Sequence, residues 1–266
     1  MCPTSSSDRG PGDDPCWHGD DTDGAGWQGV GPDAGDTRRG QLAASLAELQ
    51  RRVDKACTAA GRASSEITLI AVTKTYPSAD VAALRGLGLT DFGENRDQEA
   101  APKAAALAGL DITWHFIGQL QTNKAASVAS YAHVVHSVDR IRLVRHLGAA
   151  ARSAGRQLTC LVQVSIDGDT ERGGVPVPGV PEIAEGIEAE PGLVLGGVMA
   201  VAPLGMPPVA AFDVLRECSG AVRLIRPDAA IISAGMSADL EEAVAAGATH
   251  LRIGTALLGD RKPAVR

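Results

Sequence analysis

Eight short apolar runs recur between residues 67 and 254, and they restrict the fold more than any other feature of the chain. They cover 67–72, 89–92, 112–117, 133–138, 158–165, 193–199, 230–233 and 250–254. Segments with helical apolar spacing lie between them, at 78–86, 96–107, 139–154, 180–189, 208–223 and 239–246. Strands that alternate with helices form parallel sheets through right-handed crossovers. Eight such units, without a glycine-rich dinucleotide motif, favour an α/β fold of one closed (β/α)8 barrel over an open doubly wound sheet.

The first 40 residues have a different composition from the rest. They contain nine Gly and many Ser, Asp and Pro, without a periodic apolar pattern. Such a segment buries too little apolar surface to offset the entropy lost on ordering. We therefore expect a disordered acidic tail over 1–40 and a barrel domain over 41–266. From Gln41, leucine and valine residues at three- and four-residue steps predict an amphipathic first helix.

Charge and composition exclude several classes of function. The net charge is -7, and the first 40 residues, with eight Asp against three Arg, carry -5 of it, which leaves -2 for the rest. Nucleic-acid binding would need clustered Lys and Arg with aromatic residues between them. Without a run of about 18 apolar residues or the apolar core of a signal peptide, we expect a cytoplasmic protein with no membrane segment. The five scattered cysteines lack ligand-like spacing, so reduced thiols are expected and no metal site.

Polar residues follow most of the predicted strands, where active sites of such barrels lie. Thr73 is the first residue after the apolar run 67–72, and Lys74 follows it. An ordinary lysine has a pKa of about 10.4, and burial or nearby cations favour the neutral amine that attacks carbonyl groups. The alternative is a rim lysine in an ion pair with Glu94. The local sequence leaves both interpretations open.

The loops after the last two strands resemble a phosphate site. In many barrels a phosphate binds between these loops, at backbone N–H groups of a helix N-terminus. Gly235 and Ser237 follow the seventh run, and Gly254 and Thr255 follow the eighth. Each pair alone is also typical of a helix cap. An amine facing a phosphate site suits pyridoxal 5'-phosphate (PLP) or the substrate of a Schiff-base aldolase, and a yellow purified protein would indicate PLP.

Several motifs together carry a resemblance to a known family. They are VTKT (72–75), FGENRDQE (92–99), WHFIGQLQTNK (114–124), SVDR (137–140), VMAVAP (198–203), ISAGMSADLEEAV (232–244) and LRIGTALLG (251–259). In this order and spacing they resemble the pyridoxal phosphate homeostasis protein family, from about Leu42 to Gly259. That family is a single barrel of alanine-racemase N-terminal type, and it binds PLP without a well-established catalytic activity.

The resemblance also implies roles for individual residues. Lys74 would form the imine with PLP, Asn95 would lie near the cofactor, and Arg252 would face the pyridine nitrogen. The phosphate would be held by Ser237, Gly254 and Thr255. No catalytic residue and no metal ligand is implied. The chain departs from the family pattern at Arg96, at Leu258 and over 171–174, which affects the expected shape of the barrel mouth and not the cofactor.

We therefore predict a PLP-binding protein of vitamin B6 homeostasis that is not an enzyme. The alternative is a PLP-dependent amino-acid racemase, which needs an acid-base group on each face of the cofactor; the only tyrosines are Tyr76 and Tyr131. His115 is interpreted as a hydrogen-bonded barrel residue rather than a general base. The expected partners are PLP and PLP-dependent apoenzymes, with neither nucleic acid nor membrane, in a monomer or weak homodimer.

Overall fold

Eight parallel strands close into a barrel, because β1 pairs with β2 on one side and with β9 on the other. The computed structural model describes residues 34–259, with side chains from residue 37 onward. The barrel strands are β1 (Thr68–Val72), β2 (Asp91–Glu94), β3 (Thr113–Phe116), β4 (Val134–Val138), β5 (Leu158–Ser165), β7 (Leu193–Met199), β8 (Ile231–Ser233) and β9 (His250–Ile253). The short β6 (Val175–Pro176) pairs with β5 beside the ring. The predicted (β/α)8 barrel is confirmed.

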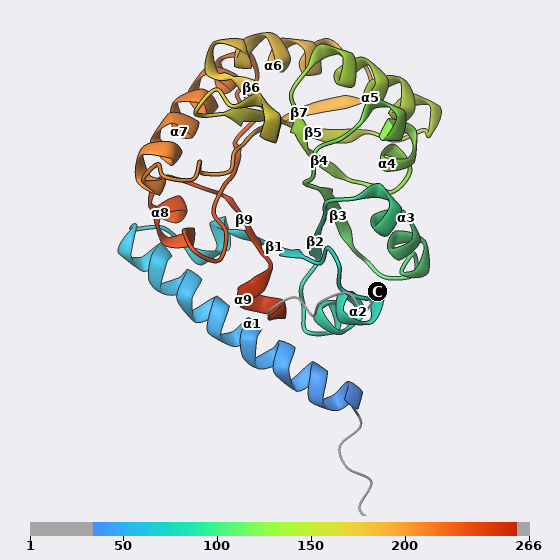
Figure 1. Cartoon of the computed structure of the whole chain (residues 1–266), viewed down its shortest axis with the longest axis vertical. Helices are drawn as coiled ribbons and strands as arrows, with labels where there is room; N and C mark the ends of the chain where they lie inside the picture. The colour runs from blue at the N-terminus through green and yellow to red at the C-terminus, as the bar shows by residue number, and fades with distance from the viewer. Residues whose placement is uncertain (1–33, 260–266) are drawn as a thin grey trace, which may run out of the picture.

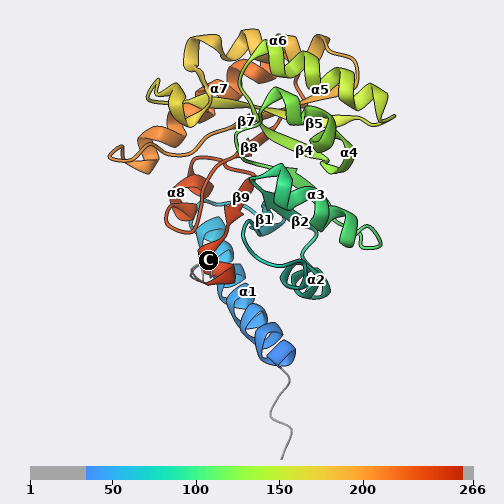
Figure 2. The same cartoon turned by 45° about the vertical axis from the view of Figure 1, so that its right-hand side comes forward.

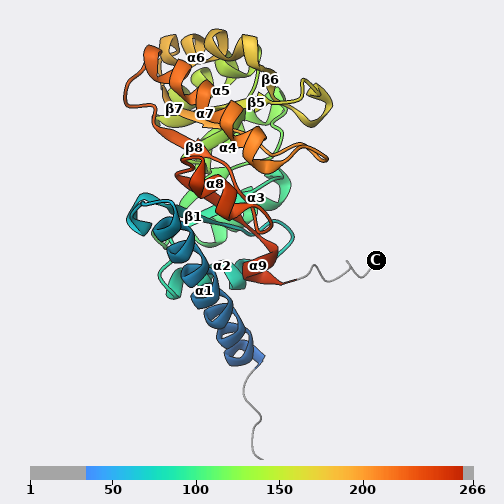
Figure 3. The same cartoon turned by 90° about the vertical axis from the view of Figure 1, so that its left-hand side faces the viewer.

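Helices surround the ring of strands (Figure 1). They are α1 (Ala34–Ala59), α2 (Ser78–Gly86), α3 (Asp97–Ala106), α4 (Ala125–Tyr131), α5 (Ile141–Ser153), α6 (Val180–Ala189), α7 (Pro208–Ile225), α8 (Leu240–Ala245) and α9 (Thr255–Leu258). Two further views show that α1 lies against the outside of the barrel, with its N-terminal end pointing away from the strands (Figures 2 and 3). Across residues 34–259, no helix is long and apolar enough to cross a lipid bilayer.

The first helix begins earlier than the sequence predicts. It starts at Ala34, so residues 34–40 belong to the helix and not to the tail expected over 1–40. Arg38 explains the extension, since its guanidinium donates to the Asp80 carboxylate at 2.7 Å and to the Leu258 carbonyl oxygen at 3.1 Å. These contacts fasten the start of α1 to α2 and α9. The rest of the expected tail, residues 1–33, lies outside the described residues.

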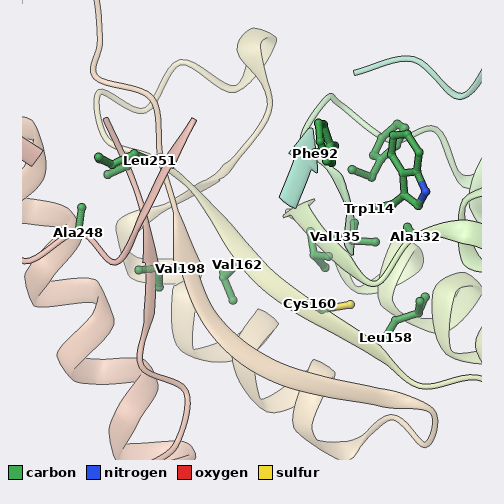
Figure 4. Packing of buried hydrophobic residues seen from close by; sticks show 14 of the residues in the cluster. Phe92, Trp114, Ala132, Val135, Leu158, Cys160, Val162, Val198, Ala248 and Leu251 are labelled. Carbon is green, nitrogen blue, oxygen red and sulfur yellow. The ribbon is translucent and has the colours of Figure 1, made fainter. Parts of the chain in front are cut away.

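The apolar core has two layers. The larger lies between the strands and the surrounding helices, and Figure 4 shows part of it, including Phe92 and Trp114, whose ring centroids are 6.2 Å apart. The smaller is made by strand residues alone, Val134, Leu161 and Met199, with Ile231 packed on them. Because successive side chains of a strand point to opposite faces, the barrel interior receives every second residue. On β3 this alternation places His115 on the opposite face from Trp114.

Three cysteines lie among the described residues: Cys57, Cys160 and Cys218. All three are buried and none is in a disulfide. Burial raises the pKa of the Cys160 thiol to about 12, so this thiol stays protonated and unreactive at neutral pH. The structure agrees with the expectation of packed, reduced thiols for these three. Cys2 and Cys16 lie outside the described residues.

Candidate functional site

A cavity of about 300 Å³ opens at the carboxyl ends of neighbouring barrel strands, and it brings together all six predicted site residues. Its lining includes Lys74, Asn95, Ser237, Arg252, Gly254 and Thr255. They come from the segments that follow β1, β2 and β8 and from β9 and the start of α9. In the ring these strands stand in the order β2, β1, β9, β8. Residues from both ends of the chain therefore meet in one mouth, which is where active sites of this fold lie.

Six further residues line the cavity and were not identified from the sequence: Val72, Tyr76, Ile117, Val201, Met236 and Ala238. Val72 and Ile117 end apolar runs, so their positions at strand ends are the signal that could have found them. Val201 and Met236 lie in irregular loops and remain partly exposed, at 45% and 39%. No periodic pattern marks such loop residues. They give the mouth an apolar rim.

A strained turn follows β1 and carries Lys74. Thr75 has a φ of 70°, the only positive φ at a residue other than glycine among the described residues. A β-branched residue in this region is sterically costly, and such strain concentrates at functional sites. The Thr75 N–H donates to the Glu99 carboxylate at 2.9 Å. This contact from α3 helps to hold the turn, and with it the backbone of Lys74.

A buried ion pair lies beneath this turn. Glu94, which is 1% exposed, accepts a hydrogen bond from the Lys103 ammonium at 2.7 Å and from the Thr73 hydroxyl at 2.8 Å. Burial raises the pKa of the Glu94 carboxyl, against the effect of Lys103. Lys103 also donates to the Thr73 carbonyl oxygen at 2.8 Å. Glu94 thus has Lys103 as a cationic partner, and the pair braces the ends of β1 and β2 under the cavity.

Asn95 brings a buried acceptor to the cavity. Its Oδ1 atom is buried and has no hydrogen-bond partner among the described residues. The backbone of Asn95 runs so close to Gly118 that a Cβ atom there would lie 2.1 Å from the Asn95 carbonyl oxygen. Only glycine permits this approach at position 118. An unsatisfied buried acceptor is costly, and it is therefore suited to a bound polar group.

The two predicted phosphate loops are joined by a hydrogen bond. The Ser237 hydroxyl oxygen accepts from the Ala256 backbone N–H in the first turn of α9, at 3.2 Å. At Gly235 the φ is 86°, and a Cβ atom would lie 2.6 Å from that of Ala243. This position needs glycine both for its backbone and for its packing. The loops after β8 and β9 therefore form one connected wall of the cavity.

Arg252 places a buried cation at the cavity wall. The residue is 5% exposed, and its guanidinium donates to the Ser233 hydroxyl oxygen at 2.6 Å and to the Ala200 carbonyl oxygen at 2.8 Å. Burial lowers the pKa of Arg252 to about 10, which still leaves the side chain protonated at neutral pH. It therefore acts only as a hydrogen-bond donor. No carboxylate is among the described residues that line the cavity.

The three departures from the family pattern lie outside the cavity lining. Arg96 is exposed next to α3, and Leu258 is buried on α9 at 2% exposure. Residues 170–172 form a short 3-10 helix that follows β5, and Gly173 ends it. The differences expected to reshape the mouth therefore do not line this cavity.

Comparison with known proteins places the chain in a family. The pyridoxal phosphate homeostasis protein of Mycobacterium tuberculosis is 43% identical over 244 residues, which cover 85% of this chain and 95% of that protein. The chain belongs to the pyridoxal phosphate homeostasis protein family. The resemblance predicted from the motifs is confirmed. The family model for the alanine racemase N-terminal domain matches residues 44–262 of this family member.

Solved structures of similar proteins agree with the barrel fold described above. PipY of Synechococcus elongatus, solved with PLP bound, is 32% identical, with a TM-score of 0.72 over 82% of this chain and 100% of PipY. Alanine racemase of Streptomyces lavendulae is 18% identical, with a TM-score of 0.66 over 85% of this chain and 58% of that enzyme. At this identity the racemase shares only the fold. The present chain matches only part of the length of that enzyme.

Proposed function

We propose that this chain binds PLP in the cavity at the barrel mouth, attached covalently through Lys74, and serves in PLP homeostasis. The observation that carries the proposal is the convergence of the six residues implied by the resemblance on one cavity. They came from four separate segments of the sequence, and nothing local forces such segments together. The family relationship and the PLP-bound PipY structure support the same ligand.

The residues present fit PLP. When bound, PLP supplies an aldehyde carbon open to attack by an amine, a phosphate and a pyridine ring. The cavity offers the amine of Lys74. The joined loops of Ser237 and Thr255 offer hydroxyl groups and backbone N–H groups that can donate to the phosphate. Asn95 brings an acceptor without a partner among the described residues. Arg252 brings donors for the ring nitrogen.

The same residues argue for a protein that holds the cofactor rather than an enzyme that uses it. Enzymes that need PLP as a strong electron sink keep its ring nitrogen protonated, and a carboxylate serves this purpose, whereas an arginine can only donate. A racemase would also need an acid-base group on each face of the cofactor. The hydroxyl of Tyr76, which lines the cavity, donates instead to the Gly259 carbonyl oxygen at 2.7 Å. We therefore propose a binding function without fast turnover. A PLP-dependent racemase remains the alternative.

Covalent attachment is tested by absorption before and after borohydride reduction, followed by peptide mass mapping. The pyridoxyl adduct is expected on the peptide that contains VTKT (72–75). Lys74→Ala should lose the absorbance of the attached cofactor and keep its far-ultraviolet circular dichroism. Lys55→Ala, a change on the exposed side of α1, is the matched control. An adduct on any other lysine of the wild-type protein would refute the assignment.

The phosphate loops are tested by comparing PLP with pyridoxal, which lacks the phosphate. Ser237→Ala should weaken PLP binding by about 3- to 10-fold, the range of one net hydrogen bond. Pyridoxal binding should change little. Equal losses for both ligands would show that Ser237 does not act through the phosphate.

Three predictions from the sequence remain proposals. PLP-dependent apoenzymes are the proposed recipients of the cofactor, which a transfer assay with a PLP-free apoenzyme would measure. A monomer or weak homodimer is the proposed assembly, which light scattering would measure. The proposed location is the cytoplasm.

A further inference from the structure

A continuous chain of hydrogen bonds crosses the barrel interior and ends at Arg252. Asp91 Oδ1 lies 2.9 Å from His115 Nε2, and His115 Nδ1 lies 2.9 Å from His136 Nε2. His136 Nδ1 lies 3.0 Å from the Ser233 hydroxyl oxygen, which accepts from Arg252 at 2.6 Å. The residues stand on β2, β3, β4, β8 and β9. Four hydrogen bonds thus connect a carboxylate to the cavity-lining guanidinium.

The two ends of this chain lie in different surroundings. Asp91 is the first residue of β2, and its side chain is 20% exposed. Arg252 is buried and lines the cavity at the mouth. Between them His115 and His136 are 2% and 0% exposed. The chain therefore runs from the edge of the barrel where β2 begins, through its closed interior, to the cavity.

With both imidazoles neutral, the charges at the two ends of the chain set the direction of every hydrogen bond. Arg252 can only donate, so the Ser233 oxygen accepts from it and its own proton is available to His136 Nδ1. His136 then carries its proton on Nε2 and donates to His115 Nδ1. His115 in turn carries its proton on Nε2, which faces the Asp91 carboxylate. In the reverse direction the bare Nε2 of His115 would face a carboxylate, and two acceptors would repel.

A neutral His136 fits this pattern. Burial lowers the pKa of His136 well below its ordinary value, and the Arg252 guanidinium lowers it further. The pKa of the neighbouring His250, whose ring centroid is 6.3 Å from that of His115, is lowered to about 4, mainly by burial. His136 can thus relay polarisation without carrying a charge. Linked hydrogen bonds polarise one another in a low-dielectric interior.

We propose that Asp91 anchors this hydrogen-bond chain, and that His115, His136 and Ser233 are positioning residues that hold the Arg252 guanidinium towards the cavity. The proposal rests on the proposed function, because the cavity is where PLP would bind. The chain fixes the orientation of Arg252 without a carboxylate in the cavity. Burial lowers the pKa of Arg252, and the Asp239 carboxylate acts against this effect. The effect of the chain on the cofactor is to hold a donor at the ring nitrogen.

The first experiment uses the cofactor-free protein with ¹⁵N-labelled histidine. NMR of the ring nitrogens should find His115 and His136 neutral, with the proton on Nε2 in both. The exposed His146, which bonds only its own helix, gives a ring outside the chain in the same spectra. A charged ring, or a proton on Nδ1 of either buried histidine, would overturn the proposal. This result does not depend on PLP binding.

The second experiment uses the protein loaded with PLP labelled with ¹⁵N in its ring. Asp91→Asn removes the charge with almost no change in volume, and Ser233→Ala breaks the chain beside Arg252. Both should shift the ring-nitrogen resonance and weaken PLP retention by about 3- to 10-fold. Asp111→Asn, whose side chain is 91% exposed, is the matched control and should leave both unchanged.

The outcomes separate the two proposals. If Asp91→Asn folds and changes the histidine protonation pattern, but the ring-nitrogen resonance and PLP retention match wild type, then the chain has only a structural role and the inference is wrong. If Asp91→Asn fails to fold, the inference is decided by two other measurements: the effect of Ser233→Ala on the ring-nitrogen resonance and PLP retention, and the histidine spectrum of the wild-type protein. If wild-type protein forms no adduct at Lys74, the proposed function fails, while the histidine spectrum still decides the chain's direction.

Discussion

Arg52 of α1 donates to the backbone carbonyl oxygen of Ser237 at 2.7 Å and to the Glu241 carboxylate at 2.6 Å. The helix that opens the domain therefore holds the loop proposed to bind phosphate, although Arg52 does not line the cavity. Because Arg52 lies on α1 and not in the cavity lining, this contact orients the loop from outside the cavity. The proposed cofactor site is therefore held in part by a residue outside the cavity lining.

Arg52→Ala should weaken PLP binding by about 3- to 10-fold. The change removes the donor to the Ser237 carbonyl oxygen, in the loop proposed to bind phosphate. Pyridoxal binding should change much less. Arg51→Ala, at the exposed neighbouring position that pairs with Glu48, is the control. Fluorescence titration with both ligands measures the difference. If Arg51→Ala weakens PLP binding as much as Arg52→Ala, the effect is one of general surface charge.

Arg38→Ala should lower the free energy of unfolding by about 1 to 2 kcal/mol. The change removes the hydrogen bonds that join α1 to Asp80 and to the carbonyl of Leu258. Arg39→Ala, at an exposed position beside it, should stay within about 0.5 kcal/mol of wild type. Urea denaturation followed by circular dichroism measures both. Equal stability of the two variants would show that the start of α1 contributes nothing to the barrel.

Acid should destabilise the fold through its buried histidines. Burial lowers the pKa of His250 to about 4, whereas a histidine of the unfolded chain titrates near about 6.5. Between these values the unfolded state binds more protons, so the free energy of unfolding falls as the pH falls through this range. The loss is at most about 1.4 kcal/mol per pH unit for this ring.

His250→Gln should flatten this pH dependence, as measured by urea denaturation at several values between pH 4 and pH 7. His146→Gln on the exposed face of α5 is the control. A remaining slope is expected from His136, whose pKa burial also lowers. An unchanged slope in His250→Gln would mean that this ring is already charged in the folded protein.

The loaded protein should not racemise or transaminate common amino acids at rates of about 1 to 1000 per second, the range of ordinary enzymes. One reason is that a protonated Arg252 does not make the pyridine ring a strong electron sink. The other is that a racemase needs a second acid-base group, and the described lining of the cavity has no carboxylate to supply it. Chiral chromatography of alanine incubated with the protein measures racemisation, with an alanine racemase as the positive control. Turnover within that range would favour the racemase alternative.

The sequence predicted the barrel well because each strand is a short apolar run with its own polar ending. The bounds of β5, β7, α2 and α6 agree with the predicted segments residue for residue. Lys74, Ser237, Gly254 and Thr255 could be selected as site candidates for the same reason, since polar residues at the end of a strand are visible in a local stretch of sequence. The roles of Asn95 and Arg252 were implied only by the family resemblance. The structure places all six in the lining of one cavity.

Features that depend on distant contacts could not be predicted. The seven residues of α4, Ala125–Tyr131, are mostly small, so their sequence shows little helical spacing of apolar residues. The start of α1 depends on Arg38 reaching Asp80, 42 positions along the chain. The interior chain from Asp91 to Arg252 exists only after the strands have closed, and from the sequence His115 was read simply as a satisfied barrel histidine. Such contacts are set by tertiary geometry and leave no local signal.

The pairing of β1 with β9, Thr68 with His250 through Ala71 with Ile253, has a consequence for biosynthesis. Lys74 leaves the ribosome early, whereas the wall that carries Arg252 and Thr255 is made almost last. Pairings between such distant segments form slowly, since a long loop must close first. On the proposed function, the nascent chain therefore carries Lys74 before the residues proposed to retain PLP have been made. PLP could then be retained only after β9 has been translated.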